Sequence, residues 1–230
     1  MKIGGLQKTS LLDYPDNVSA IVWTVGCNFH CPFCYNKDIV EGKTGLISEE
    51  EIFVFLEKRK GLIEGLVITG GEPLMQEGIT DFCEKVKKLG YLIKIDTNGM
   101  YPEKLQELVD KKLVDYIAMD VKAPKKKYND LSGVKADIKK IQGSIDIIRK
   151  SGVDYEFKTT FIPEFLTQKD IVEIGEWLKG SKRFYIQQFK NDVPMISSEM
   201  SAIKPYSRDE ILDTLEKVKT FFEFCNVRGI

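Results

Sequence analysis

The sequence predicts an α/β fold in which parallel strands form a partial barrel. Six short apolar segments rich in β-branched residues alternate with amphipathic helical patterns. Each segment is a nearly continuous apolar run, as expected of a strand covered on both faces, and a helix between strands is what a parallel sheet requires. No Gly-x-Gly-x-x-Gly follows the first strand, which disfavours a dinucleotide-binding fold. We therefore expect residues 1–230 to form a single six-stranded domain.

The expected strands end where polar residues begin, at least for the first four of them. Functional groups of barrel enzymes gather at the carboxyl ends of the strands, so this edge is the expected site. The six strands are expected at 19–24, 65–69, 92–96, 116–120, 154–160 and 183–188.

The helical patterns between the strands carry recognisable start and stop signals. Ser48-Glu-Glu-Glu51 has the pattern of a capping box, and Thr167 to Asp170 resembles another cap. Pro102 sits at a plausible first helical position, and Ser207-Arg-Asp-Glu210 opens a last helix expected at 207–225. The patterns end near glycines, which favour the left-handed conformation that closes helices.

Composition narrows the class of function. Charged residues make up 30% of the chain but the net charge is −1, which argues against nucleic-acid binding, and the lysines at 125–127 are interpreted as a solvated loop. No segment approaches the roughly 20 apolar residues of a membrane helix, and the first residues lack the apolar core of a signal peptide. A cytoplasmic protein is expected, in which clustered cysteines indicate metal rather than disulfides.

Three cysteines lie within eight residues, Cys27, Cys31 and Cys34, on a loop expected at 25–36 after the first strand. Such spacing lets three thiolates meet at one soft metal centre. A structural zinc site usually has four ligands, and His30, the one histidine, is too close to Cys31 to complete it easily. A zinc-binding module therefore remains only an alternative. Cys83, inside an apolar helical pattern, is expected to be a buried structural cysteine, as is Cys225.

The pattern Cys-x3-Cys-x-aromatic-Cys, with Phe33 as the aromatic residue, resembles the cluster motif of the radical S-adenosylmethionine (SAM) superfamily. The resemblance implies a partial (β/α)6 TIM-like radical SAM barrel with a [4Fe–4S] cluster on Cys27, Cys31 and Cys34. The iron without a cysteine would bind the amino and carboxylate groups of SAM. Reduction would then cleave SAM into methionine and a 5′-deoxyadenosyl radical, while the protein binds, orients and shields the cofactors.

Three strand ends supply residues that such a cofactor needs. Gly70 and Gly71 permit close approach of a ligand, and Glu72 can accept a hydrogen bond from an ammonium group. Alone, Asp96-Thr-Asn-Gly99 would be a turn, and Met119-Asp-Val-Lys122 would be a strand end with an ion pair. Together they resemble glycyl-radical-enzyme activases. That resemblance implies cofactor contacts and a possible monovalent cation on Asp96, Thr97 and Asp120, with Asn98 in the same loop and Lys122 neutralising the SAM carboxylate.

Four further residues complete the predicted site. Lys158 stands where the activases generally carry an arginine, and Lys190 aligns with a histidine of a formate-lyase activase, so both depart from the family pattern. Phe33 and Tyr35 flank the last cysteine and are expected either to contact adenine or only to pack.

The segment from Gly4 to Pro15, and Asp120–Pro124 with Leu131–Gly133, resemble the anaerobic ribonucleoside-triphosphate reductase activating proteins. The resemblance implies an oxidoreductase that makes a glycyl radical on a large partner enzyme, with flavodoxin or ferredoxin as electron donor. Glycine is a plausible target because it has no Cβ to block approach. The alternative is a small-molecule radical SAM enzyme, such as a 7-carboxy-7-deazaguanine synthase-like protein. A basic cluster inside the barrel would favour it, and the sequence reveals none.

Overall fold

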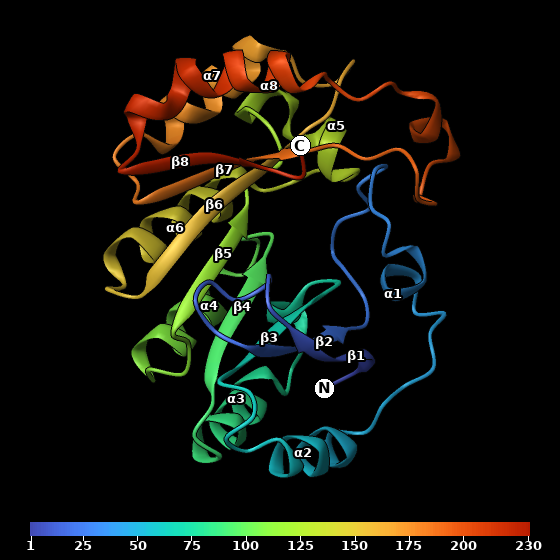
Figure 1. Ribbon diagram of the computed structural model, residues 1–230, viewed down its shortest axis with the longest axis vertical. Helices are drawn as coiled ribbons and strands as arrows, with labels where there is room; N and C mark the ends of the chain where they lie inside the picture. The colour runs from blue at the N-terminus through green and yellow to red at the C-terminus, as the bar shows by residue number, and fades with distance from the viewer. The chain divides into compact units, whose positions relative to one another are not determined.

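The computed structural model describes residues 1–230 and confirms the α/β class (Figure 1). The chain forms two compact units, each assembled from three segments. Unit 1 comprises 1–28, 36–118 and 140–154, and unit 2 comprises 29–35, 119–139 and 155–230. The expectation of one domain stays a prediction.

Unit 1 contains the sheet β1-β2-β3-β4-β5. β1 (Ile3–Ser10) is antiparallel to β2 (Ser19–Thr24), whereas β2, β3 (Gly65–Gly70) and β4 (Leu92–Thr97) run parallel. Of β5 (Tyr116–Asp120), the first three residues belong to unit 1 and the last two to unit 2. On one face a buried apolar cluster is formed by Tyr14, Ile21, Val67, Tyr116 and Ala118.

The helices of unit 1 begin and end where local chemistry dictates. Ser48 and Glu51 form the predicted capping box of α2, because each side chain accepts a hydrogen bond from the other's backbone N–H. Pro102 begins α4, and Gly90 follows α3 with a φ of 91°. The helices are α1 (Lys37–Glu41), α2 (Glu49–Lys58), α3 (Ile79–Lys88), α4 (Pro102–Asp110) and most of α6 (Ile138–Lys150).

Unit 2 contains the parallel strands β6 (Asp154–Phe161), β7 (Arg183–Gln188) and β8 (Phe224–Arg228). Helices α7 (Gln168–Leu178) and α8 (Arg208–Val218) lie side by side, and α8 contacts both β7 and β8 (Figure 1). Both begin with capping boxes, so the predicted caps at Thr167 and Ser207 are confirmed. The remaining helix, α5 (Tyr128–Ser132), ends at Gly133.

Two strands were missed by the sequence interpretation, which expected six rather than eight. β1 contains two glycines and three exposed polar residues, so its sequence resembles a loop. The expected helix 207–225 is wrong at its end, because α8 stops at Val218, a single turn of 3₁₀ helix follows, and β8 begins at Phe224. Cys225 consequently lies half-buried on a strand, not inside a helix.

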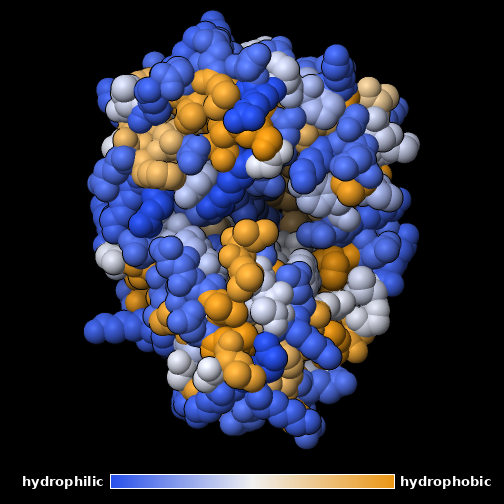
Figure 2. Space-filling model, viewed as in Figure 1, coloured by the Kyte–Doolittle hydropathy of each residue, from blue (hydrophilic) through white to orange (hydrophobic).

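Helices long and apolar enough to cross a membrane are absent. Hydrophobic and hydrophilic residues are interspersed on the face shown in Figure 2.

Candidate functional site

The predicted site residues fall into two groups, one in each unit. Unit 1 holds Cys27, the Gly70–Glu72 turn and the Asp96–Asn98 turn. Unit 2 holds the remaining residues: Cys31, Phe33, Cys34, Tyr35, Asp120, Lys122, Lys158 and Lys190.

In unit 1, the two glycines after β3 let the chain pass directly against the start of the cysteine loop. The backbone N–H of Gly71 donates to the carbonyl of Thr24 at 2.8 Å, and that of Glu72 donates to the carbonyl of Gly26 at 2.9 Å. A Cβ on Gly71 would lie 1.8 Å from the Gly26 oxygen, and one on Gly70 (φ 115°) would lie 2.5 Å from the Thr24 nitrogen. The bare backbone therefore serves contact within the chain, beside the ligand contact expected from sequence.

Glu72 is 1% exposed, and its carboxylate connects the turns that follow β3 and β4. Oε1 accepts hydrogen bonds from the Thr97 hydroxyl at 2.7 Å and from the Leu74 N–H at 3.0 Å. Oε2 accepts from the N–H of Asn98 at 2.7 Å. A buried carboxylate with three donors is satisfied and holds both turns in place.

Asn98 joins this network to the first cysteine. Its Nδ2 donates to Asn28 Oδ1 at 2.8 Å and lies 3.8 Å from the Cys27 sulfur, within hydrogen-bond distance for sulfur. Its Oδ1 accepts from the N–H of Met100, which fixes the orientation of the amide. The next residue, Gly99, accepts from the Ser144 hydroxyl of α6 at 2.7 Å. An amide N–H directed at sulfur stabilises a thiolate ligand.

Asp96 is already paired with a lysine. Lys94 Nζ lies 2.6 Å from Asp96 Oδ1, and Thr69 Oγ1 donates to Asp96 Oδ2 at 3.5 Å. Lys94 was not identified as a site residue from the sequence. The signal was a lone lysine in the apolar run Leu92–Ile95, where a buried charge requires a partner.

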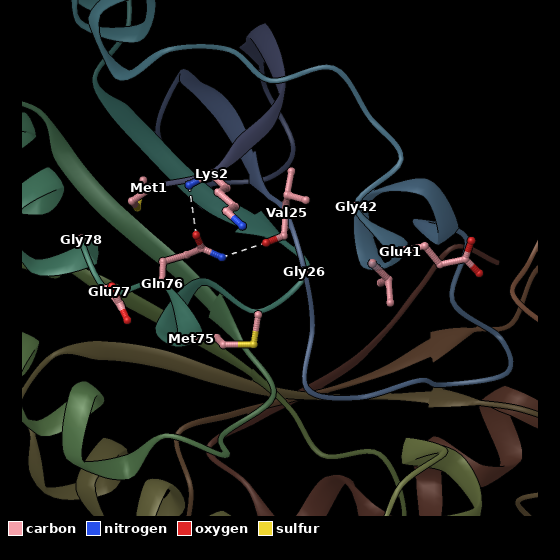
Figure 3. Close-up of a pocket in the computed structure, with 11 residues that line it drawn as sticks. Met1, Lys2, Val25, Gly26, Glu41, Gly42, Met75, Gln76, Glu77 and Gly78 are labelled. Atoms are coloured by element: carbon pink, nitrogen blue, oxygen red, sulfur yellow. Dashed lines mark hydrogen bonds between the residues drawn. The ribbon is translucent and has the colours of Figure 1, made fainter.

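A cavity of about 640 Å³ in unit 1 adjoins the start of the cysteine loop (Figure 3). Its lining includes Val25, Gly26 and Met75 as well as the amide of Gln76. Gln76 Nε2 donates to the carbonyl of Val25 at 2.9 Å, and its Oε1 accepts from the N–H of Lys2 at 3.1 Å. The Gln76 side chain thus connects Val25, two residues before Cys27, to Lys2, the residue before β1.

In unit 2, the other two cysteines share one tight turn, with the N–H of Cys34 donating to the carbonyl of Cys31 at 3.1 Å. The end of α5 packs on this turn. The Ser132 carbonyl accepts from the N–H of His30 at 2.8 Å and lies 3.8 Å from the Cys31 sulfur. At Gly133 a Cβ would lie 2.1 Å from the His30 oxygen. The His30 side chain itself is exposed.

A second segment of unit 2 also contacts the cysteine turn. Between β7 and α8, the N–H of Ile196 donates to the carbonyl of Cys34 at 3.0 Å, and that of Ser197 donates to the carbonyl of Pro32 at 2.9 Å. Met195 beside them is buried. These contacts could not be foreseen, because the segment has no periodic pattern.

Two lysines and one aspartate lie in the same unit as these thiols, and the aspartate contacts both lysines. Asp120 Oδ1 lies 3.3 Å from Lys122 Nζ, and Asp120 Oδ2 lies 3.8 Å from Lys158 Nζ. Burial raises the pKa of the Cys31 thiol to about 11, although the nearby Lys122 acts to lower it. Burial acts against the charge of Lys122, but Asp120 and Cys31 outweigh it, so the pKa of Lys122 is raised.

The remaining predicted residues of unit 2 differ in their surroundings. Phe33 is buried, and the Lys122 ammonium lies 5.7 Å from its ring centre, which is within range of a cation–π contact. Tyr35 and Lys190 are exposed. Cys83 is fully buried on α3, as predicted, and burial raises its pKa to about 12.

The polar face of β6–β8 contains residues that sequence reasoning missed. Arg228 binds the buried carboxylate of Glu156 through both terminal nitrogens, at 2.5 and 2.8 Å, and its guanidinium carbon lies 3.5 Å from the Tyr185 ring centre. Because β8 itself was missed, Arg228 had no predicted place in the sheet.

This chain belongs to the radical SAM superfamily, whose family model matches residues 21–178. A protein of Methanocaldococcus jannaschii named "Putative glycyl-radical enzyme activating enzyme" is 36% identical over 194 residues, covering 82% of this chain and 80% of that protein. A "Probable GTP 3',8-cyclase" of Saccharolobus islandicus is 29% identical over 211 residues, covering 90% of this chain but 65% of the cyclase.

Among solved structures, SuiB of Streptococcus suis, bound to its precursor peptide SuiA, has a TM-score of 0.68 at 15% identity. The likeness covers 91% of this chain and 48% of SuiB. At this identity it shows the fold alone, and with the family match it confirms the predicted partial radical SAM barrel.

Membership of this superfamily makes the chain an enzyme and implies a [4Fe–4S] cluster and SAM. No group of three His, Cys, Asp or Glu side chains is already gathered as a metal site. The donor chemistry nevertheless fits an iron–sulfur cluster, because the motif offers three thiols, one beside the Asn98 amide and one beside the Lys122 ammonium. Both neighbours stabilise thiolates over thiols.

Proposed function

We propose that this chain is an activase that generates a glycyl radical on a partner enzyme. The observation that carries the proposal is the match to the M. jannaschii relative, which extends across about four-fifths of both chains. A match of that extent spans the turns after β3, β4 and β5. Beyond the three motif cysteines the chain has only Cys83 and Cys225, too few for a second cluster.

In this proposal Cys27, Cys31 and Cys34 hold the [4Fe–4S] cluster, which with SAM supplies reductive cleavage to a 5′-deoxyadenosyl radical. The chain's own residues bind and orient. Lys122 and Lys158 offer positive charge to the SAM carboxylate. The remaining proposed contacts with SAM are Phe33, Tyr35, Gly70, Gly71, Glu72, Asp96, Thr97, Asn98, Asp120 and Lys190.

The proposed partner is an anaerobic ribonucleoside-triphosphate reductase, with flavodoxin or ferredoxin as electron donor. Its support is the resemblance of Gly4–Pro15 and of Asp120–Pro124 to activating proteins of that group. In the structure Leu131–Gly133, the other motif of that resemblance, packs on the cysteine turn. The motif thus supports the cluster loop rather than standing apart from it.

The test is to incubate the reduced, cluster-loaded chain with SAM and a candidate reductase, and to record the EPR spectrum. We expect a glycyl doublet on the reductase. Cys31→Ala should abolish iron binding and the doublet, whereas the matched Cys225→Ala variant should keep both. The proposal would be overturned if the chain cleaves SAM but forms no glycyl radical on any glycyl radical enzyme tested.

The second candidate is a small-molecule radical SAM enzyme, favoured by the 29% match to the GTP 3',8-cyclase. An anionic small molecule needs positive charge that is not already balanced. Arg228 is already paired with the buried carboxylate of Glu156, which weakens this candidate. Turnover of a purine or pterin substrate by the cluster-loaded chain would establish it.

A further inference from the structure

Lys94 is a charged residue within an apolar face of unit 1. It lies on β4 opposite Val67 of β3, and Val67 belongs to the apolar cluster described above. The side chain is 5% exposed, and its ammonium lies 6.0 Å from the centre of the Tyr116 ring. An ammonium in such surroundings is costly unless a counter-charge accompanies it.

The counter-charge is Asp96, which follows two residues later on the same face of β4. The 2.6 Å contact between Lys94 Nζ and Asp96 Oδ1 is that of a charge-assisted hydrogen bond. The Asp96 side chain is 18% exposed and the Lys94 side chain is 5% exposed, so the carboxylate is the more accessible member of the pair. The carboxylate is therefore neutralised from within the chain.

The resemblance to the activases implied a monovalent cation held by Asp96, Thr97 and Asp120. The residues of this chain do not fit such an ion well. Asp96 is paired with Lys94, and the Thr97 hydroxyl donates a hydrogen bond to Glu72. Asp120, in unit 2, has the ammonium groups of Lys122 and Lys158 within 4 Å. Each carboxylate expected to hold the ion already has a lysine partner.

We propose that the Lys94 ammonium takes the place of the monovalent cation at Asp96. The inference rests on the proposed function only in treating the turn after β4 as part of the SAM site. It makes Lys94 a positioning residue, which fixes Asp96 and balances its charge without touching SAM. SAM binding by this chain should then not depend on sodium or potassium.

The test compares SAM affinity of the cluster-loaded chain, by calorimetry, in potassium chloride and in tetramethylammonium chloride at equal ionic strength. Tetramethylammonium is too large to replace a bound ion. The wild-type affinity should agree within about twofold. Lys94→Met leaves Asp96 without its cation, so it should lose about fivefold or more in tetramethylammonium and recover in potassium, as expected for linked binding.

Lys94→Arg keeps the positive charge and should behave like wild type in both salts. Two results would overturn the inference: a wild-type loss of about fivefold in tetramethylammonium, or a Lys94→Met affinity that is the same in both salts. If Lys94→Met does not fold, the wild-type and Lys94→Arg comparisons still decide. No partner enzyme is present, so failure to find a glycyl radical would overturn only the proposed function.

Discussion

The two units hold their site residues by different physical means. In unit 1, the start of the cysteine loop is held by backbone contact at Gly71 and by the buried carboxylate of Glu72. In unit 2, the second and third cysteines lie beside a partly exposed charge cluster of Asp120, Lys122 and Lys158. The closest backbone contact to the cysteine loop is thus found in unit 1, whereas in unit 2 a lysine acts on the pKa of a motif cysteine.

This difference indicates how each group of residues should respond to change. Close backbone contact leaves no room for an added atom, so unit 1 should be sensitive to small increases in volume. The ion pairs of unit 2 are 15–23% exposed, so water and salt screen them only in part, and single charge changes there should have graded effects.

Gly71→Ala should have the largest effect. Its Cβ would lie 1.8 Å from the oxygen and 2.5 Å from the carbon of Gly26, the residue before Cys27, so the loop must move. Overpacking typically costs about 1–3 kcal/mol and occasionally more, and this contact is closer than any real Cβ contact. We expect iron content after anaerobic reconstitution to fall to background.

The matched control is Gly45→Ala, because a Cβ at Gly45 meets no atom within 4 Å. This variant should load iron like wild type. Normal iron content in Gly71→Ala would show that backbone contact does not position the first cysteine.

Alkylation of Cys31 tests the electrostatics of unit 2. Only the thiolate reacts, and a pKa raised from 9.0 to about 11 lowers the thiolate fraction at pH 8 about a hundredfold. Iodoacetamide labelling of the cluster-free chain, followed by mass spectrometry, should still accelerate above pH 10. Because the folded state holds this proton more tightly, the stability contribution is complete below pH 9 and is lost as pH rises towards 11.

Lys122→Met should slow the labelling of Cys31 further, since Lys122 lowers the pKa of that thiol. The control is Lys126→Met, which makes the same substitution at an exposed lysine. A labelling rate that levels off below pH 9, or that Lys122→Met leaves unchanged, would contradict the assignment.

Gly133→Ala should have a smaller effect than Gly71→Ala, although its Cβ would lie 2.1 Å from the His30 oxygen. Gly133 follows a helix of only five residues, which can shift more readily than the end of a central strand. Gly152→Ala is the control, because φ is similar at the two positions, 68° and 73°, but Gly152 has no neighbour within 4 Å. Both variants carry about 1 kcal/mol of backbone strain.

Iron content should therefore fall severalfold in Gly133→Ala and remain normal in Gly152→Ala. Equal loss in both variants would mean that backbone strain alone, rather than contact with the cysteine turn, explains the effect.

The sequence predicted the parallel strands well and the edge strands poorly. The expected strands 19–24, 116–120 and 183–188 agree with the structure at both ends. The first two are mostly buried runs, whereas in 183–188 only Phe184 and Ile186 are buried. β1 and β8 are exposed and mixed in character, so neither gives such a run. Phe222 and Cys225 also continue the helical period of α8, which concealed the start of β8.

The motif residues can be identified from the sequence because their chemistry allows few residue types. The segments that hold them in place cannot be identified in this way. Nothing in the sequence connects Ser132 with His30, or Ile196 with Cys34, since backbone hydrogen bonds leave no mark on residue type. Lys94 was detectable in principle, as a lysine in an apolar strand. The resemblance to the activases assigns its partner Asp96 to an ion instead.

Substitution of Lys158 by arginine should have the smallest effect, a small change in SAM affinity. Its ammonium lies 3.8 Å from Asp120, a longer contact than that of Lys122 at 3.3 Å. Lys158→Arg keeps the charge and restores the residue of the family pattern, so SAM affinity should change by less than about twofold. Lys158→Met, measured by the same calorimetry, should lose severalfold and lose less at high salt. A large loss of SAM affinity in Lys158→Arg would mean that side-chain shape matters at this position, as it does at Gly71. Unit 2 would then resemble unit 1 in its sensitivity to volume at that position.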